Sequence, residues 1–242
     1  MRPDQAFGGP TAALIHDLPL PAQWERDPSL HVVALGSVRM RRPGVVATRS
    51  TSGTIVRVDG LPVLDPVSTW VSLATVLGVD DLVAVGDRLV TGDRGRRPVA
   101  GIHELRCAVE EAEGRRHVRA LRAALPLIRV GAWSRPETHL RLLVMRAGLP
   151  EPQLNARVVL RGGRAVRPDI SWASRRVALE YDGSAFHGRS DWDVDASRHE
   201  LLIDEGWTVV RVRADDLYRS PVALAARLRH RLLFTREVTN DR

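Results

Sequence analysis

Residues 165–182, AVRPDISWASRRVALEYD, decide the fold of the second half of the chain. Polar and apolar residues alternate in each half of this stretch. The apolar positions are Pro168, Ile170 and Trp172 in the first half and Val177, Leu179 and Tyr181 in the second. Because side chains two residues apart share a face of a strand, the stretch predicts two β-strands. They run from about Ala165 to Trp172 and from Arg176 to Asp182, and each has one core face and one polar face.

The carboxylates of this stretch fall on the polar faces. If Ala173-Ser174 is a two-residue hairpin loop, Asp169 lies opposite Ala178, and Glu180 is its diagonal neighbour at about 7–8 Å. A four-residue loop preserves this parity, whereas a three-residue loop turns one strand over. The apolar pattern agrees only with an even loop. We therefore expect Asp169, Glu180 and Asp182 to project from one face of the sheet.

A cluster of like charges needs a compensating partner. Three carboxylates on one face repel one another, and a hard cation with oxygen ligands relieves that repulsion. Mg²⁺ usually binds through one or two carboxylates together with phosphate. The cluster therefore predicts a Mg²⁺ (or Mn²⁺) site that acts on a phosphodiester. The alternative is a solvated acidic sheet face that holds no metal, although sheets normally scatter opposite charges rather than cluster like ones.

The sequence around this stretch predicts helices that flank a mixed sheet. Ser134-Arg-Pro-Glu137 has the spacing of a capping box and begins a helix. A second helix is expected from about Trp192 to Glu205, a strand from Trp207 to Arg213, and a last helix after Ser220-Pro221. This order predicts an α/β domain over residues 129–242, with a mixed sheet and helices on its faces.

The first half, residues 1–128, predicts a smaller α/β domain. Strands are expected at Leu30 to Leu35, Gly44 to Thr48 and Thr54 to Val58. Asp65-Pro66 has the form of an N-cap followed by proline at the first helical position, and Asp80 is expected to cap another helix. Two further helices are predicted, at Ile102 to Glu113 and Val118 to Leu125.

Composition narrows the class of protein. All 36 basic residues are arginine, and the net charge is +7 with neutral histidines. A positive net charge favours binding to nucleic acid, because binding releases counterions. The alternative is that coding bias explains a basic set made only of arginine. No apolar run approaches the roughly 18 residues of a membrane helix, and the N-terminus has no signal-peptide pattern. Cys107 is the single cysteine, which is consistent with a reducing compartment. We expect it to be a small core residue. We expect a cytoplasmic protein with no membrane partner.

Short motifs follow one another in a fixed order from Ser134 to Leu217. They are Glu137, Pro168-Asp169, Glu180-Tyr181-Asp182-Gly183, His187, Asp195-Ala-Ser-Arg198 with Leu202, Gly206, and Val209-Val210-Arg211. This set resembles the PD-(D/E)xK nuclease superfamily, and within it the very-short-patch-repair-like branch. The resemblance implies a restriction-endonuclease-like fold. Asp182 stands where the general signature has a lysine, and the chain contains no lysine.

The resemblance also implies roles for individual residues. Asp169 and Glu180 would bind the metal and, with Asp182, form the catalytic carboxylates. His187 would transfer a proton or position the attacking water in place of the signature lysine. Arg198, Arg211 and Arg213 are candidate contacts to backbone phosphates.

Several of these residues have a simpler explanation. Glu137 is a further metal ligand in the family pattern, but it stands at the third helical position, where a capping-box glutamate belongs. His187 is also explained as a surface histidine in a polar loop. Asp195 and Arg198 are one helical turn apart and can form a local ion pair.

Two functions of different classes follow. The first is a metal-dependent endonuclease-like hydrolase that acts on DNA; the sequence does not distinguish DNA from RNA. The second is a non-catalytic DNA-binding regulator or antitoxin built on a nuclease fold. The missing lysine favours the second function. So does the resemblance of Ala6 to Pro21 and Leu61 to Leu89 to the N-terminal part of abortive-infection-type antitoxins.

Overall fold

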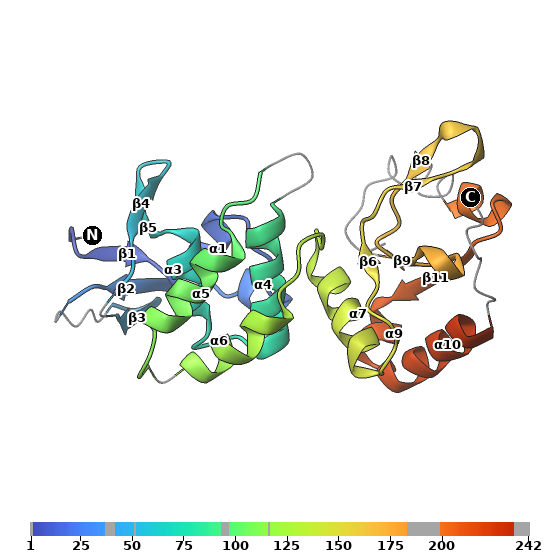
Figure 1. Cartoon of the computed structure of the whole chain (residues 1–242). Helices are drawn as coiled ribbons and strands as arrows, with labels where there is room; N and C mark the ends of the chain where they lie inside the picture. The colour runs from blue at the N-terminus through green and yellow to red at the C-terminus, as the bar shows by residue number, and fades with distance from the viewer. Residues whose placement is uncertain are drawn as a thin grey trace. The chain divides into compact units, whose positions relative to one another are not determined.

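The structure is a computed structural model that describes residues 2–36, 42–50, 52–92, 97–115, 117–182 and 199–234. The chain divides into two compact units, Met1–Arg135 and Pro136–Arg242. Each unit contains helices and a mixed β-sheet (Figure 1), so the predicted α/β class is confirmed. Within the described residues, no helix has the length and apolar character needed to cross a membrane.

The first unit is built on a five-stranded sheet in the order β3-β2-β1-β5-β4. Its strands are β1 (Gln5–Phe7), β2 (Leu30–Ala34), β3 (Val45–Arg49), β4 (Ile55–Val58) and β5 (Leu61–Leu64). β2 and β3 are parallel, as are β1 and β5, and the other neighbours are antiparallel. The three predicted strands are confirmed. β1 and β5 were not predicted: β1 has only three residues, and β5 contains Pro62, which weakens the sequence pattern of a strand.

Six α-helices are described in the first unit. N-caps were predicted for two of them, and one of these predictions is correct. The helices are α1 (Gly9–Ile15), α2 (Ala22–Glu25), α3 (Pro66–Leu73), α4 (Val79–Thr91), α5 (Ile102–Glu111) and α6 (Val118–Ala124). Asp65 caps α3 as predicted, because its carboxylate accepts hydrogen bonds from the amides of Val67 and Ser68 at 2.9 and 3.1 Å. The prediction that Asp80 caps α4 is wrong. Gly78 is the N-cap, and Asp80 lies in the first turn, where a negative charge favours the helix dipole.

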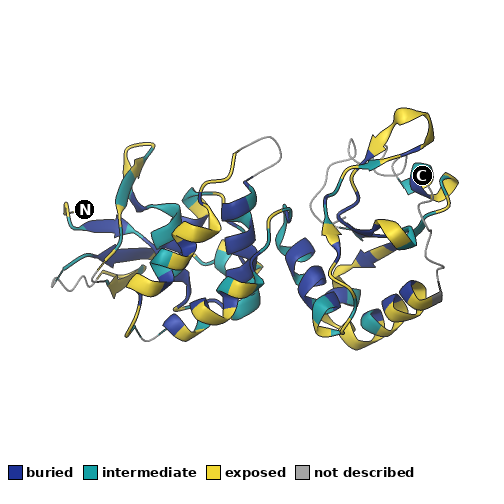
Figure 2. Cartoon of the chain, in the orientation of Figure 1, coloured by how far each residue is buried: buried dark blue, intermediate teal, exposed yellow. Residues whose placement is uncertain are grey.

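Trp70 joins the helices in the core of this unit. Its side chain is fully buried, and its indole Nε1 donates a hydrogen bond to the carbonyl of Leu82 at 2.9 Å. Through this bond α3 is held against α4. Figure 2 shows that α4 is buried along most of its length.

The first unit ends later than the sequence predicts. The predicted boundary lies after residue 128, whereas the unit extends through residue 135. The segment after Ile128 is held by α4: the amide of Arg129 donates to the carboxylate of the buried Asp87 at 2.6 Å. Local sequence patterns do not show this boundary, because Asp87 lies about forty residues earlier in the chain.

The second unit contains a four-stranded mixed sheet in the order β11-β10-β9-β6. Its strands are β6 (Gln153–Leu154), β9 (Ile170–Trp172), β10 (Val177–Asp182) and β11 (Thr208–Arg213), and only β10 and β11 are parallel. A separate two-stranded sheet pairs β7 (Val158–Val159) with β8 (Ala165–Val166). The helices are α7 (Arg135–Arg146), α9 (Ala214–Tyr218), α10 (Pro221–Phe234) and the helical residues 199–204.

Both faces of this sheet carry apolar side chains. On one face, Ile170 and Leu179 pack with Leu140 of α7 and Leu228 of α10. On the other face, a smaller core joins Ala178 to residues of β7, β8 and the helix over 199–204: Val158, Leu160, Val166, Leu201 and Leu202. The face that was expected to be polar is therefore apolar at one end and polar at the other.

The predicted strand from Ala165 to Trp172 is wrong as a single element. β8 ends at Val166 and β9 begins at Ile170, and the two strands belong to different sheets. Pro168 explains the break, because it has no N–H to donate to a sheet ladder. Asp169 consequently lies immediately before β9 rather than inside a strand.

A substitution at Gly86 of α4 tests the contact between α4 and Ile128, near the end of the first unit. A Cβ atom at Gly86 would lie 2.3 Å from Cδ1 of Ile128. We expect Gly86→Ala to lower the free energy of unfolding by about 1–3 kcal/mol through overpacking, although alanine is the better helix former. Urea denaturation followed by circular dichroism measures this change.

The control is the same substitution in an Ile128→Ala background, where the clashing atoms are absent. There Gly86→Ala should be close to neutral or stabilising. An equal loss of stability in both backgrounds would show that Gly86 does not contact Ile128 in this way.

Candidate functional site

Four polar residues that lie in or directly next to neighbouring strands form one row across the second sheet. β10 and β11 pair Glu180 with Arg211. β9 and β10 pair Ile170 with Leu179, so Asp169, the residue before Ile170, lies opposite Glu180. On the other side of Asp169, its carbonyl accepts a hydrogen bond from the amide of Asn155 at 3.0 Å. The row therefore runs Asn155, Asp169, Glu180, Arg211.

The hairpin between β9 and β10 confirms the predicted parity and corrects the predicted loop. Trp172 pairs with Val177, which leaves a four-residue loop over 173–176. Ala178 pairs with Ser171 and not with Asp169. The two-residue loop is therefore wrong, whereas the even parity that places Asp169, Glu180 and Asp182 on one face is correct. Asp169 and Glu180 are therefore closer than the predicted diagonal arrangement would place them, because directly opposed Cβ atoms lie about 4.5–5.5 Å apart.

Asp169 and Glu180 are buried. Each is only 7% exposed, and Asp169 accepts a hydrogen bond from the backbone amide of Tyr181 through Oδ2 at 2.8 Å. The Asp169 carboxylate is thus fixed against β10, the strand that carries Glu180. Two buried carboxylates on adjacent strands disfavour their own ionised forms unless a cation or hydrogen-bond donors compensate them.

Asn155, which the sequence analysis missed, links a third buried carboxylate to this row. Its side-chain amide donates to Oε2 of Glu137 at 2.6 Å, and Glu137 is 4% exposed. The backbone of Asn155 has a φ of 46°, in the left-handed region that asparagine tolerates, and Arg167 donates to its carbonyl at 2.9 Å. Helix capping alone does not explain a contact between Glu137 and a residue eighteen positions away. The one available signal was an asparagine directly after a possible strand.

Asp182 lies beside an arginine on the neighbouring strand. β10 and β11 pair Asp182 with Arg213, and Arg213 Nε lies 3.7 Å from Asp182 Oδ2. In the described ranges there is no group of three or more histidine, cysteine or acidic side chains that could hold a metal. The catalytic role of Asp182 stays a prediction. Arg211 and Arg213 are exposed, as contacts to phosphate require.

Three residues of the predicted site cannot be placed. His187, Asp195 and Arg198 lie outside the described residues. Their predicted roles in proton transfer, ion pairing and phosphate contact stay predictions.

His199, one of the helical residues 199–204, lies close to Arg211 of the row. Burial, followed by the positive charge of Arg211, lowers the pKa of His199 below its ordinary value of 6.5, and Glu200 opposes this shift. Its Nδ1 is buried and has no hydrogen-bond partner within the described part of the chain. Near neutral pH the side chain is therefore an uncharged imidazole, the form that can accept a proton. No sequence pattern distinguishes this histidine.

Asp169 and Glu180 have the chemistry that Mg²⁺ or Mn²⁺ requires. Both offer hard oxygen donors from adjacent positions of the sheet. Mg²⁺ usually keeps several waters and takes one or two carboxylates together with a substrate phosphate. Two protein carboxylates therefore suffice, and Glu137 can support the site through Asn155 without being a direct ligand.

The lowered pKa of His199 can be measured by NMR titration of its imidazole. We expect a pKa below 6.5 in the folded protein, and Arg211→Gln should raise it because a neighbouring positive charge is removed. A folded-state pKa below the unfolded value favours the neutral form, so this group should reduce stability as the pH falls below about 6.5.

Arg219→Gln is the matched control, since Arg219 pairs with Asp215 on α9. It should leave the titration of His199 unchanged. A pKa of His199 that is the same in the Arg211→Gln variant and the unaltered protein would contradict the proximity of the two side chains.

Two proteins of Mycobacterium tuberculosis are similar to this chain. They are the uncharacterized protein Rv2248 of strain ATCC 25618 / H37Rv and the uncharacterized protein MT2308 of strain CDC 1551 / Oshkosh. Each is 32% identical over 210 residues, which cover 86% of this chain and 75% of the relative. No family model and no solved structure matches the chain. A match of 210 residues is longer than either compact unit, so the similarity includes sequence from both. The chain belongs to the same protein family as Rv2248 and MT2308.

Proposed function

We propose that the second unit is a metal-dependent endonuclease-like hydrolase that cleaves phosphodiester bonds in DNA. The observation that carries the proposal is the direct opposition of two buried carboxylates, Asp169 and Glu180, at one level of the sheet. These two residues would hold Mg²⁺ or Mn²⁺. A bound ion would supply Lewis-acid chemistry: it would polarise the scissile phosphate, activate water and neutralise developing charge.

The surrounding residues hold these carboxylates in position. The amide of Tyr181 orients the Asp169 carboxylate, and Asn155 connects Asp169 to Glu137 through its backbone and its side chain. A carboxylate that is locked before substrate binds loses little entropy when the reaction begins. This arrangement supports catalysis rather than a merely acidic surface.

The exposed arginines next to the carboxylates suit a polyanionic substrate. Arg211 lies in the same row as Glu180, and Arg213 is paired with Asp182. Contacts of this kind position a nucleic-acid backbone without reading its sequence. His199, held neutral beside Arg211, is a second candidate for proton transfer in addition to His187.

The alternative function is a non-catalytic DNA-binding regulator or antitoxin that uses the same fold. One contact favours it. Asp182 stands at the position of the signature lysine, and its carboxylate lies 3.7 Å from the Nε atom of Arg213. A chain in which this position forms an internal ion pair can bind DNA without cleaving it.

A cleavage assay with supercoiled plasmid and with single- and double-stranded oligonucleotides tests the proposed activity. We expect cleavage with Mg²⁺ or Mn²⁺ and none in EDTA. Asp169→Asn and Glu180→Gln should each reduce the rate about a hundredfold or more, because each removes a metal ligand. Asp204→Asn, an exposed acidic residue on the helix over 199–204, is the matched control and should cleave normally.

Two results would reject the hydrolase. One is the absence of cleavage on every form of DNA, and the other is an unchanged rate in Asp169→Asn. Salt-sensitive DNA binding that persists in EDTA without cleavage would instead support the regulator. Cleavage confined to RNA oligonucleotides would keep the chemistry and change the substrate.

Asn155→Gly tests whether the amide of Asn155 positions the site. Glycine keeps the left-handed backbone of this residue and removes only the side chain that binds Glu137. We expect the Mg²⁺ concentration at half-maximal activity to rise by about 10–100-fold. Asp59→Gly, at another left-handed position in the turn between β4 and β5 (φ 50°), is the matched control. Equal Mg²⁺ dependence in Asn155→Gly and the unaltered protein would assign Asn155 a purely structural role.

A further inference from the structure

The first unit contains a cavity of about 960 Å³ between its sheet and helices α3 and α5. This volume is at the upper end of the roughly 300–1,000 Å³ that small-molecule sites occupy. The apolar part of its wall comes from strands β2 and β5 and from helices α3, α5 and α6. The residues include Val33, Leu64, Val67, Val71, Ala108 and Leu121.

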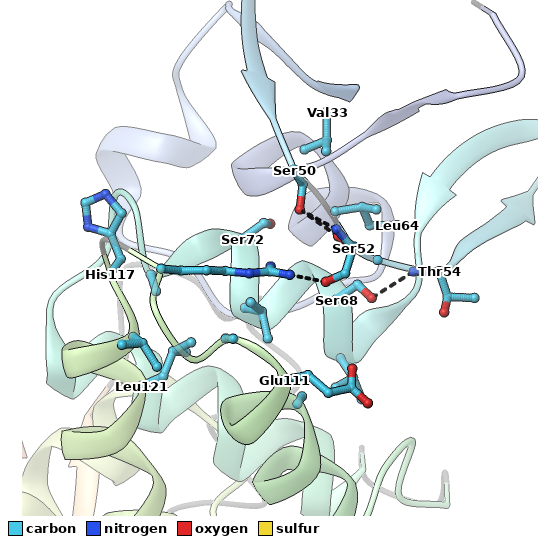
Figure 3. Close-up of a pocket in the computed structure, with 18 of the residues that line it drawn as sticks. Val33, Ser50, Ser52, Thr54, Leu64, Ser68, Ser72, Glu111, His117 and Leu121 are labelled. Atoms are coloured by element: carbon cyan, nitrogen blue, oxygen red, sulfur yellow. Dashed lines mark hydrogen bonds between the residues drawn. The ribbon is translucent and has the colours of Figure 1, made fainter. Parts of the chain in front are cut away.

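One edge of the cavity carries converging hydrogen-bonding groups. Ser50 Oγ donates to the carbonyl of Ser52 at 2.6 Å and accepts from the amide of Ser52 at 3.3 Å. A guanidinium nitrogen of Arg115 donates to Ser52 Oγ, so two hydroxyls and one positive charge meet there (Figure 3). These groups come from the segment after β3 and from the turn after α5, which lie far apart in the sequence.

Two of the three acidic residues of the wall are used at helix starts. Asp65 is used by the N-terminus of α3, where it accepts from two amides and from Ser68 Oγ. Glu104 accepts a hydrogen bond from the amide of Gly101 at the start of α5. Among the described residues, the Arg115 guanidinium donates to a neutral hydroxyl and forms no ion pair. Glu111 is the remaining acid, and in Figure 3 it lies along the edge opposite Ser50 and Ser52.

Cys107 also lines this cavity and corrects the sequence analysis. It was expected to be a core residue, but it is half-buried, and its Sγ lies 3.7 Å from Nε2 of His103 on the same helix. Leu105 and Val109 of α5 are buried in the core, whereas Cys107 and Ala108 of the same helix line the cavity.

We propose that this cavity binds a small amphipathic anion, with its apolar body against Val67, Val71 and Ala108. Its carboxylate or phosphate group would contact Arg115 and the hydroxyls of Ser50 and Ser52. The charge-assisted bond from a guanidinium makes an anion the preferred polar group, and the apolar wall excludes a fully hydrophilic ion as the best ligand. This inference concerns the first unit and does not depend on the hydrolase.

Isothermal titration of the full chain with decanoate, decyl phosphate and decanol tests the proposal. The three probes share an apolar chain and differ in charge. We expect decanoate or decyl phosphate, or both, to bind about tenfold more tightly than decanol, and the stronger of the two identifies the anionic group. Arg115→Gln should abolish this difference. Arg57→Gln, on β4 and bound to the carbonyl of Gly60, lies outside the cavity wall and should change nothing.

Two further variants separate the apolar wall from the charged edge. Ala108→Phe fills the cavity and should weaken all three probes, whereas Ala123→Phe, at an exposed position of α6, should not. Glu111→Gln should strengthen both anions by removing a nearby negative charge. Thermal unfolding checks that each variant is folded, and Ser52→Ala replaces Arg115→Gln if the latter is not. Equal affinity for the anions and decanol, no binding of any probe, or unchanged binding in Ala108→Phe would overturn the proposal.

Discussion

The burial of two carboxylates side by side is the constraint on which the second unit depends. Removing each ionised group from water costs roughly several kcal/mol, and their mutual repulsion adds to that cost. Asp169, immediately before β9, nevertheless lies opposite Glu180 of β10, and each residue is only 7% exposed. Polar groups surround the two carboxylates. The amide of Tyr181 donates to Asp169, and Arg211 pairs with Glu180 in the adjacent strand. Asn155, which is bonded to the backbone of Asp169, donates its side-chain amide to Glu137. A chain that needed only stability would be served better by apolar residues in these positions.

The position of the row within the sheet explains how such a site can coexist with a core. Ala178 and Glu180 point to the same face, yet Ala178 belongs to a hydrophobic cluster and Glu180 belongs to the row. The apolar end of the face is covered by β7, β8 and the helix over 199–204. The opposite face packs on α7, α9 and α10. The polar end is thus anchored on a rigid scaffold, which is what a site with fixed geometry requires.

The two units use acidic residues differently. In the first unit, Asp65 and Glu104 satisfy the amides at the starts of α3 and α5, so their charges belong to local secondary structure. In the second unit, Glu137 also lies in the first turn of a helix, α7. Its carboxylate, however, accepts a hydrogen bond from Asn155, which belongs to a distant segment of the chain. The position of a carboxylate in the first turn of a helix therefore does not show whether it caps the helix or belongs to a functional site. Its partner decides which role it has.

The sequence by itself determined the strand that ends at Asp182 to within one residue, the even parity of the hairpin before it, and the cap at Asp65-Pro66. Each of these follows from a local rule: a period of two along a strand, or a carboxylate placed before a proline. Tertiary structure decided the four-residue loop that sets Asp169 directly against Glu180, the break at Pro168, and the contact that places Arg129 with the first unit. It also decided the role of Asn155 and the proximity of His199 to Arg211. The physical reason is that local periodicity fixes which face a side chain occupies, whereas its partner is fixed by pairing and packing with residues far away in the chain.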